Sequence, residues 1–214
     1  MKGRGVARRA LEAVVLVSHL SARSTSSTAA RVAEGYVVRE ATGADLARLA
    51  ADLGHEITPR KVALIHERAG NQRYAVFVAS TLSGEICGFG QIEFGRIRDE
   101  HLSLHLGAAP EVAHLIDDYV GVRHRGHRLQ AALVTARIQH AHARGSSIMT
   151  VLVEASNRAS RASMGRAGFR PAFRVLTLRT PWWKHSWALC RDPRARITHT
   201  AGSPGRYPET PPTT

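Results

Sequence analysis

The alternation of hydrophobic and polar residues predicts an α/β domain over most of the chain. Expected strands, read from alternating or continuous apolar runs, lie at 36–41, 74–79, 86–94, 113–122, 149–153 and 173–178, with a last one near 188–191. Helices are expected after Thr42 and Thr58 and before Gly145. Threonine caps helix N-termini well and glycine often follows helix ends.

The stretch 120–145 joins the end of a strand, a basic turn and a helix. Such a connection leaves several backbone N–H groups free at the helix start, where the helix dipole also attracts phosphate oxygens. Gly126 permits close approach of a ligand, and Arg123, Arg125 and Arg128 add charge that suits a pyrophosphate. The alternative is an ordinary strand-to-helix loop with solvated arginines.

This run resembles motif A of the GNAT superfamily of acyl-CoA N-acyltransferases, [Q/R]-x-x-[G/A]-x-[G/A], which lies between strand four and helix three. With Arg125 at the first place, residues 125–130 read R-G-H-R-L-Q and Leu133 falls on the family's helix leucine. Arg128 and Gln130 then fill the two glycine places. A second register, two residues earlier, has a glycine at the first of these places but moves the leucine off its position.

A second segment resembles motif B of the same family. The expected strand from Met149 ends at Asn157, and the run to Phe169 matches N-x-x-[A/S], a short helix and a Gly-Phe pair. The two motifs stand in the family's order, and the resemblance covers roughly residues 36–190.

The resemblance implies a GNAT-like α/β fold: a mixed, mostly antiparallel central sheet of six to seven strands, flanked by helices and splayed between strands four and five. The acetyltransferase domain is expected at 36–191. A flexible N-terminal extension (1–35), which is also compatible with a targeting segment, precedes it. A disordered proline-rich tail (192–214) follows.

The implied function is an N-acetyltransferase that moves an acetyl group from acetyl-CoA to a primary amine by direct attack in a ternary complex. Acetyl-CoA is the acyl-donor substrate, and no metal is expected. Arg128 is expected to reach the ribose 3′-phosphate region. The expected coenzyme-binding residues are Val120 and Val122 for the pantetheine arm, Arg125, Gly126, His127, Arg128, Leu129 and Gln130 for the pyrophosphate, and Asn157.

The general base has three candidates. His114 and Asp118 are expected on one face of the fourth strand, and Glu93 on the third. A histidine near its normal pKa suits the deprotonation of an ammonium at neutral pH. Met164 stands where the family has a tyrosine acid, so a serine or solvent would protonate the leaving thiolate.

The composition keeps other classes of function open. Lys and Arg number 30 against 17 for Asp and Glu, giving a net charge of +13 and a pI near 11.2. Such a charge favours anionic partners: nucleic acid, acidic membranes or a phosphate-rich coenzyme. Nucleic acid is an unlikely partner because few aromatic residues interleave with basic ones. A catalytically impaired GNAT-fold protein that binds acyl-CoA or regulates is the main alternative, since the motif glycines and the tyrosine are replaced.

The remaining expectations concern setting and partners. Two cysteines, Cys87 and Cys190, are too few for a disulfide framework, and no apolar run reaches about 18 residues. These features indicate a cytoplasmic protein without a membrane partner. The acceptor is expected to be a small-molecule amine or a peptide, and a homodimer is possible because dimers are common in the family.

Overall fold

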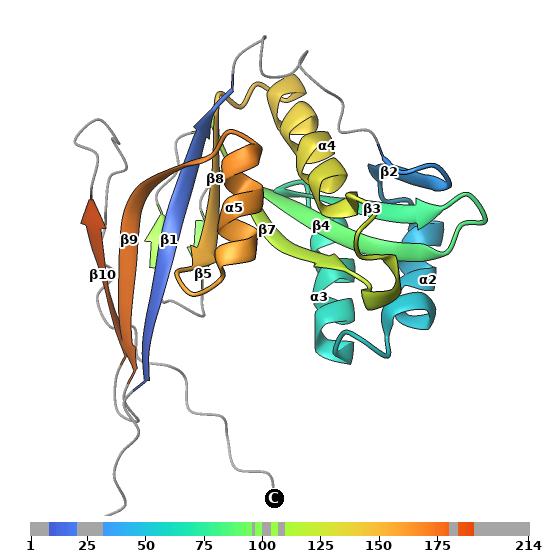
Figure 1. Ribbon diagram of the computed structural model, residues 1–214, viewed down its shortest axis with the longest axis horizontal. Coiled ribbons are helices and arrows are strands. Elements are labelled where there is room, and N and C mark those ends of the chain that lie inside the picture. The colour runs from blue at the N-terminus through green and yellow to red at the C-terminus, as the bar shows by residue number, and fades with distance from the viewer. Residues whose placement is uncertain are drawn as a thin grey trace, which may run out of the picture.

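The computed structural model describes residues 9–20, 32–95, 97–99, 104–106, 110–179 and 184–190. Its framework is an eight-stranded sheet in the order β10-β9-β1-β8-β7-β4-β3-β2. Helices α4 and α5 lie on one face of this sheet and α2 and α3 on the other (Figure 1). Adjacent strands are antiparallel except for the parallel pair β7–β8. The mixed, mostly antiparallel sheet that the sequence predicts is confirmed.

The elements follow one another closely in sequence. The sheet strands are β1 (Arg9–His19), β2 (Tyr36–Glu40), β3 (Tyr74–Thr81), β4 (Ile86–Phe94), β7 (Val112–Val120), β8 (Ile148–Glu154), β9 (Arg170–Arg179) and β10 (Lys184–Cys190). The helices are α2 (Gly43–Leu53), α3 (Pro59–Ala69), the 3-10 helix η1 (Val122–His124), α4 (Leu129–Ala143) and α5 (Arg158–Arg166).

Both threonines predicted to start helices are N-caps. The Thr42 hydroxyl accepts a hydrogen bond from Asp45 N at 3.3 Å, and Thr42 N donates to Asp45 Oδ2 at 2.7 Å, a reciprocal capping box. Thr58 accepts from Lys61 N at 3.2 Å, and Pro59 occupies the first turn, where its missing N–H is not needed. Local sequence therefore fixes the start of α2 and α3.

The N-terminal segment differs from its prediction. Residues 9–19 are not part of an extension outside the domain: they form β1, which lies between β8 and β9 and is antiparallel to both. Ala13, Val14, Val15 and Leu16 are all at most 4% exposed, because both faces of the strand are covered. With this strand the sheet has eight strands, whereas six to seven were expected. The predicted tail, 192–214, lies outside the described residues.

The segment between β4 and β7, expected to be a long loop, contains a small antiparallel pair. Its strands are β5 (Ile97–Asp99) and β6 (Leu104–Leu106). They form a separate two-stranded sheet.

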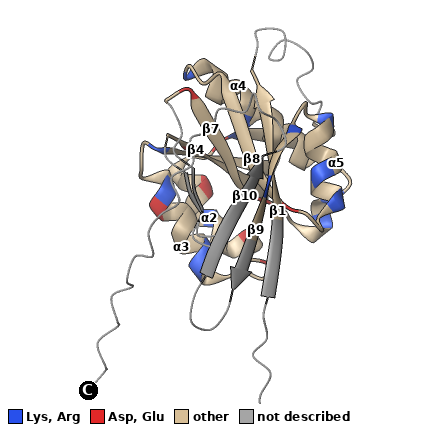
Figure 2. Ribbon diagram, turned by 90° about the vertical axis from the view of Figure 1, so that its left-hand side faces the viewer, with Lys and Arg blue, Asp and Glu red and all other residues tan. Residues whose placement is uncertain are grey.

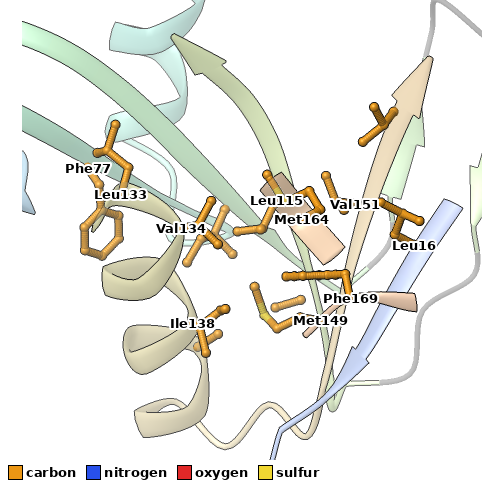
Figure 3. Close-up of a cluster of buried hydrophobic side chains, with 14 of the residues drawn as sticks. Leu16, Phe77, Leu115, Leu133, Val134, Ile138, Met149, Val151, Met164 and Phe169 are labelled. Atoms are coloured by element: carbon orange, nitrogen blue, oxygen red, sulfur yellow. The ribbon is translucent and has the colours of Figure 1, made fainter. Parts of the chain in front are cut away.

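Two hydrophobic layers hold the helices to the sheet. On one face, α4 and α5 pack against the strands in a layer that includes Leu133, Met149 and Phe169 (Figure 3). On the other face, Leu49 and Leu53 of α2 and Ile65 of α3 pack on β3 and β4. Fully burying side chains of this size stabilises the fold by about 1.5–3 kcal/mol each.

The sheet opens between β7 and β8. The two strands pair only from Val112–Leu115 to Ile148–Val151, at the start of each. Beyond this point the last five residues of β7 have no partner on β8, and the strands diverge (Figure 1). The splay that the sequence predicts between the fourth and fifth strands of the domain is therefore present.

Candidate active site

Two cavities open on either side of this splay. The α4-side cavity, of about 1080 Å³, lies between the N-terminal half of α4 and α5. The α3-side cavity, of about 1170 Å³, lies between α3, the sheet and the start of α5. Asp118 and Gln130 line both cavities. Two ligands entering from opposite faces of the sheet would therefore meet at the splay.

The turn before α4 presents backbone N–H groups to the α4-side cavity. Gly126 and Arg128 both have left-handed backbone conformations, with φ values of 87° and 61°. No side chain caps α4, and the first hydrogen bond of the helix runs from Ala132 N to Arg128 O at 3.1 Å. The N–H groups of the first turn therefore have no acceptor within the helix, an arrangement that binds phosphate oxygens.

Positive side chains surround this turn. Arg125, Arg128 and Arg166 line the α4-side cavity. Further arginines lie on α5, which carries Arg158 and Arg161 and is marked by blue segments of the ribbon in Figure 2. Part of the net positive charge of the chain is therefore concentrated around the start of α4, where anions would bind.

Arg128 stores backbone strain at this turn. A left-handed conformation costs a residue with a Cβ about 1 kcal/mol relative to glycine. We expect the free energy of unfolding of Arg128→Gly to exceed that of Arg128→Ala by about 1 kcal/mol. Both variants remove the guanidinium, but only Arg128→Ala keeps a Cβ. Thermal unfolding of the two variants measures this difference, about 2–4 °C for a domain of this size. Equal melting temperatures would contradict it.

The backbone N–H groups of Val120 and Val122, both expected to bind the pantetheine arm, have different surroundings. Gly121 N donates to Cys87 O on β4 at 2.8 Å, so the N–H of the preceding Val120 points to the opposite edge, into the splay. The N–H of Val122, in contrast, already donates to Glu56 Oε2 at 2.9 Å. The prediction that the Val122 amide is free to bind a ligand is therefore wrong, because a carboxylate from the α2–α3 connection occupies it.

Glu56 thus holds the turn rather than a ligand. Tyr119 Oη donates to its Oε2 at 2.6 Å. This hydrogen bond and the one from Val122 N lower the pKa of Glu56. Glu56 lines neither cavity. Its two bonds fix the end of β7 to the loop before α3.

Asn157 also has a structural role. Its Oδ1 accepts from Ser160 N at 3.0 Å and caps α5. Its side chain lines the α3-side cavity, not the cavity beside the α4 turn. Three other expected coenzyme residues are placed as follows. Arg125 Nε donates to Val120 O at 3.3 Å, and the His127 ring lies tilted against the Tyr36 ring, with 5.0 Å between the ring centroids. Leu129, the first residue of α4, is buried.

A β-bulge separates the candidate bases of β7. Gln91 pairs with Ile116 and Phe89 with Tyr119, so Gly90 alone faces both Asp117 and Asp118. Asp117 has a φ of 49°. The extra residue reverses the alternation of side chains beyond it. The prediction that His114 and Asp118 share a face is therefore wrong: His114 faces α3, and Asp118 pairs with a residue of α4.

Asp118 is committed to a buried cation. Its partner is Arg137 of α4, whose side chain is 0% exposed. Arg137 also donates to Leu133 O at 3.0 Å and to Gln91 O at 3.1 Å. This carboxylate is engaged in an ion pair, and its loss would leave a buried cation unpaired.

His114 lies deep in the α3-side cavity. It is 2% exposed, and its Nδ1 lies 2.6 Å from Thr150 Oγ1, which itself donates to Ala113 O at 3.4 Å. Nδ1 therefore carries the proton in this network, which leaves Nε2 as the acceptor nitrogen. Burial lowers the pKa of His114 to about 4. The ring is neutral at pH 7 and a weak base.

This burial predicts a pH dependence of stability. Below about pH 6.5 the unfolded chain binds a proton on His114 that the folded protein takes up only near pH 4. The free energy of unfolding should therefore fall as the pH drops through this window, by up to about 3 kcal/mol. In His114→Gln, which does not titrate, that part of the decline should vanish. Urea unfolding at pH 7 and pH 4.5 tests this. The same loss of unfolding free energy between the two pH values in both proteins would contradict it.

Glu93 is the third candidate, and it faces the same cavity. It pairs across the sheet with His114 and is 4% exposed. Its Oε1 accepts from Arg73 Nη2 at 2.8 Å and from Tyr74 Oη at 3.1 Å. Burial raises the pKa of Glu93, and this effect outweighs the hydrogen bond from Tyr74 and the charge of Arg73.

Comparison with known proteins agrees with this geometry. The sequence model of the Acetyltransferase (GNAT) family matches residues 45–169, more than half of the chain. The chain belongs to the GNAT acetyltransferase family. No curated protein sequence matches it. The family match spans the β7–α4 turn and extends to Phe169, so it contains both motifs identified in the sequence.

Solved structures share the fold at low sequence identity. A tandem GNAT protein from the clavulanic acid biosynthesis pathway superimposes with a TM-score of 0.60 at 17% identity, over 82% of this chain and 55% of that one. A GCN5-related N-acetyltransferase from Sphaerobacter thermophilus gives 0.54 at 16% identity, over 81% and 53%. A putative GNAT acetyltransferase from Novosphingobium aromaticivorans gives 0.52 at 16%, over 83% and 66%. The chain thus spans half to two thirds of these proteins.

Sequence reasoning missed several residues of this GNAT site. Lys61 and Arg68 of α3 line the α3-side cavity, and neither was a candidate in the sequence. The signal was the helical spacing of seven, which places Lys61 and Arg68 on one face of α3. Arg137 was also missed, although it interrupts the apolar stripe of α4, four residues after Leu133.

Among the residues that the structure describes, no group of three or more His, Cys, Asp or Glu is placed to hold a metal ion. Over the same residues, no helix combines the length and apolar character that crossing a bilayer requires.

Proposed function

We propose that this GNAT protein transfers an acetyl group from acetyl-CoA to a primary amine by direct attack in a ternary complex. The observation that supports this most is the pair of cavities that meet at the splay beside an uncapped helix start. One cavity suits a donor that carries phosphates, and the other suits a polar acceptor. A site that brings two substrates together gains much of its rate from proximity alone.

The donor would occupy the α4-side cavity. Its pyrophosphate would lie on the N–H groups from Gly126 to Gln130, with Arg125 and Arg128 adding charge. The N–H of Val120 would bind the pantetheine arm in the splay. The Arg128 side chain, exposed at the rim, is suited to the ribose 3′-phosphate region. Asn157 lines the α3-side cavity, so its amide nitrogen would reach the donor only where the two cavities meet at the splay, while its oxygen caps α5.

Glu93 is the general base that the geometry favours. Asp118 is paired with Arg137, and His114 has a pKa of about 4. Glu93 lines the α3-side cavity, both of its hydrogen bonds fall on Oε1, and its pKa is raised. Its Oε2 therefore remains to accept a proton, directly or through water in the cavity.

The proposed reaction needs no covalent enzyme intermediate. The ammonium of the acceptor gives a proton to Glu93, and the neutral nitrogen then attacks the thioester carbonyl carbon. A C–N bond forms, and the carbonyl electrons move to oxygen, close to the N–H of Val120. When the carbonyl reforms, the C–S bond breaks and the thiolate of coenzyme A leaves. The attacking nitrogen still carries one proton more than the amide, and this proton passes to the thiolate through water or through the hydroxyl of Ser163, which lines the α4-side cavity.

A second candidate function is supported by three substitutions in the motifs. Arg128 and Gln130 fill glycine places, and Met164 fills that of the tyrosine acid. Met164 is 1% exposed and has no proton to donate. A protein that binds acyl-CoA for a regulatory purpose, without turnover, would tolerate these changes.

Thermal unfolding in the presence of acetyl-CoA tests the donor assignment, with ATP as a phosphate control. Selective stabilisation by acetyl-CoA is expected, because ATP offers phosphates but no pantetheine arm for the splay. Equal stabilisation by both compounds would indicate unspecific anion binding. No stabilisation by acetyl-CoA would overturn the proposal.

A further inference from the structure

Two consecutive aspartates form the bulge of β7, and they point to opposite faces of the sheet. Asp117 and Asp118 share one partner, Gly90, on β4. Consecutive side chains of a strand point to opposite faces, and the bulge decides which face each aspartate takes: without it, Asp118 would share the α3 face with His114. Each aspartate binds cations from a different helix.

Asp117 binds α3. Lys61 Nζ donates to its Oδ1 at 2.6 Å, and Arg68 Nη1 donates to its Oδ2. Arg68 Nη1 also lies 3.3 Å from Gln91 Oε1 on β4. Burial raises the pKa of Asp117, but the bonds and charges of Lys61 and Arg68 outweigh this effect and keep the pKa below its ordinary value. The carboxylate is therefore charged, and it joins α3 to the bulge.

Asp118 binds α4 through the buried guanidinium of Arg137. The position of this guanidinium depends on Gly90: a Cβ there would lie 2.6 Å from Arg137 Cζ and 2.9 Å from Asp118 Oδ1. The absence of a side chain at Gly90 thus makes room for the pair. Arg137 Nη1 also donates to Gln91 O, so Arg137 joins α4 to β7 through Asp118 and to β4 through Gln91.

A stabilising role alone does not account for five charged groups around one bulge, of which Arg137 is fully buried and the other four are partly withdrawn from water. Removing two charges from water costs several kcal/mol per ion, and attraction between them often only offsets that cost. Apolar side chains would hold the two helices to the sheet at least as well. The charged groups do provide direction, because a carboxylate with two partners fixes the orientation of its backbone.

We propose that Asp117 and Asp118 form a charged clamp that fixes the bulge of β7 and thereby couples the α3-side and α4-side cavities. Lys61, Arg68 and Arg137 are positioning residues in this clamp. The bulge lies two residues before Val120, where β7 has left β8, so a shift at the bulge moves the N–H that faces the splay. The proposal rests on the proposed function in one respect: it takes the splay as the place where donor and acceptor meet.

The clamp predicts effects across the sheet. Lys61 and Arg68 line only the α3-side cavity, yet the double variant Lys61→Met/Arg68→Met should weaken acetyl-CoA binding about tenfold, measured by calorimetry. Arg137 lines neither cavity, and Arg137→Met should weaken it similarly. The control is Arg48→Met, which breaks an ion pair of α2 with Asp52 away from the bulge. Wild-type affinity in the double variant would overturn the clamp.

A second measurement does not depend on the coenzyme. Hydrogen–deuterium exchange of the peptide that covers β7 should be faster in the double variant than in Arg48→Met, because the bulge loses its anchor. If the double variant does not fold, Asp117→Asn replaces it, since asparagine tolerates a positive φ and keeps the shape of the side chain. Unchanged exchange would overturn the clamp. A wild-type protein that fails to bind acetyl-CoA would instead overturn the proposed function.

Discussion

Replacing Glu93 with glutamine is expected to lower kcat for acetyl transfer about 100-fold and to leave the affinity for acetyl-CoA unchanged. Glutamine keeps the shape of the side chain and can still bond Arg73 and Tyr74, so the fold should survive. What it cannot do is accept the proton of the acceptor ammonium. Because Glu93 lines only the α3-side cavity and contacts neither aspartate of the clamp, donor binding should not change.

The pH dependence of kcat provides the second part of this test. The pKa of Glu93 is raised by burial, so the carboxylate becomes protonated, and inactive as a base, as the pH falls through that raised value. The wild-type kcat should therefore decline on the acid side, and Glu93→Gln should lack this decline. Glu111→Gln, an exposed carboxylate at the start of β7 that lines neither cavity, is the matched control. A Glu93→Gln variant with the wild-type kcat and the same acid limb would contradict the assignment.

Replacing Gly126 with valine should weaken acetyl-CoA binding at least about tenfold. Gly126 has a φ of 87°, which a β-branched residue adopts only at a cost of about 1–3 kcal/mol. No heavy atom lies within 4 Å of the position of an added Cβ. The effect is therefore conformational rather than a steric clash: the turn relaxes, and the N–H groups before α4 no longer converge on one point.

Gly126→Asn is the matched control for this prediction. Asparagine is larger than alanine but tolerates positive φ far better than valine does. Its affinity for acetyl-CoA should stay within a few-fold of the wild type, while that of Gly126→Val falls. Equal losses in both variants would show that the surface of Gly126, and not its backbone conformation, is what the ligand needs.

Local patterns predicted most of the fold. The caps at Thr42 and Thr58, the strands of the meander and the turn before α4 each follow from residues that lie next to one another in sequence. The splay and the order of the strands came from the family resemblance, since no local pattern specifies which strands pair. Both could be predicted because the motifs fix where the β7–α4 and β8–α5 connections fall.

The N-terminal strand escaped prediction for a physical reason. Residues 13–17 form a short continuous apolar run between polar segments. A strand covered on both faces has no alternation, and a run of that length does not distinguish it from other apolar segments. Its partners, β8 and β9, begin 129 residues or more after β1 ends, since β1 ends at His19 and β8 begins at Ile148. Nothing next to the run indicates that they exist.

The bulge escaped prediction for a different reason. Alternation places His114 and Asp118 on one face, and one additional residue opposite Gly90 reverses that assignment. Two signals were present in the sequence: adjacent aspartates in a strand, and an arginine within the apolar stripe of α4. Each is ambiguous alone. Only their proximity in space shows that Asp118 is bound to Arg137.

The central claim is that an acetyl group passes between the two cavities at the splay. The most direct test is thiol release from acetyl-CoA in the presence of a panel of primary amines and peptides, with mass spectrometry of the products. We predict thiol release that depends on the amine, and an N-acetylated product, with at least one member of the panel. Acetyl-CoA that binds selectively, yet releases no more thiol with any amine than without one, would contradict the claim and favour a binding or regulatory protein.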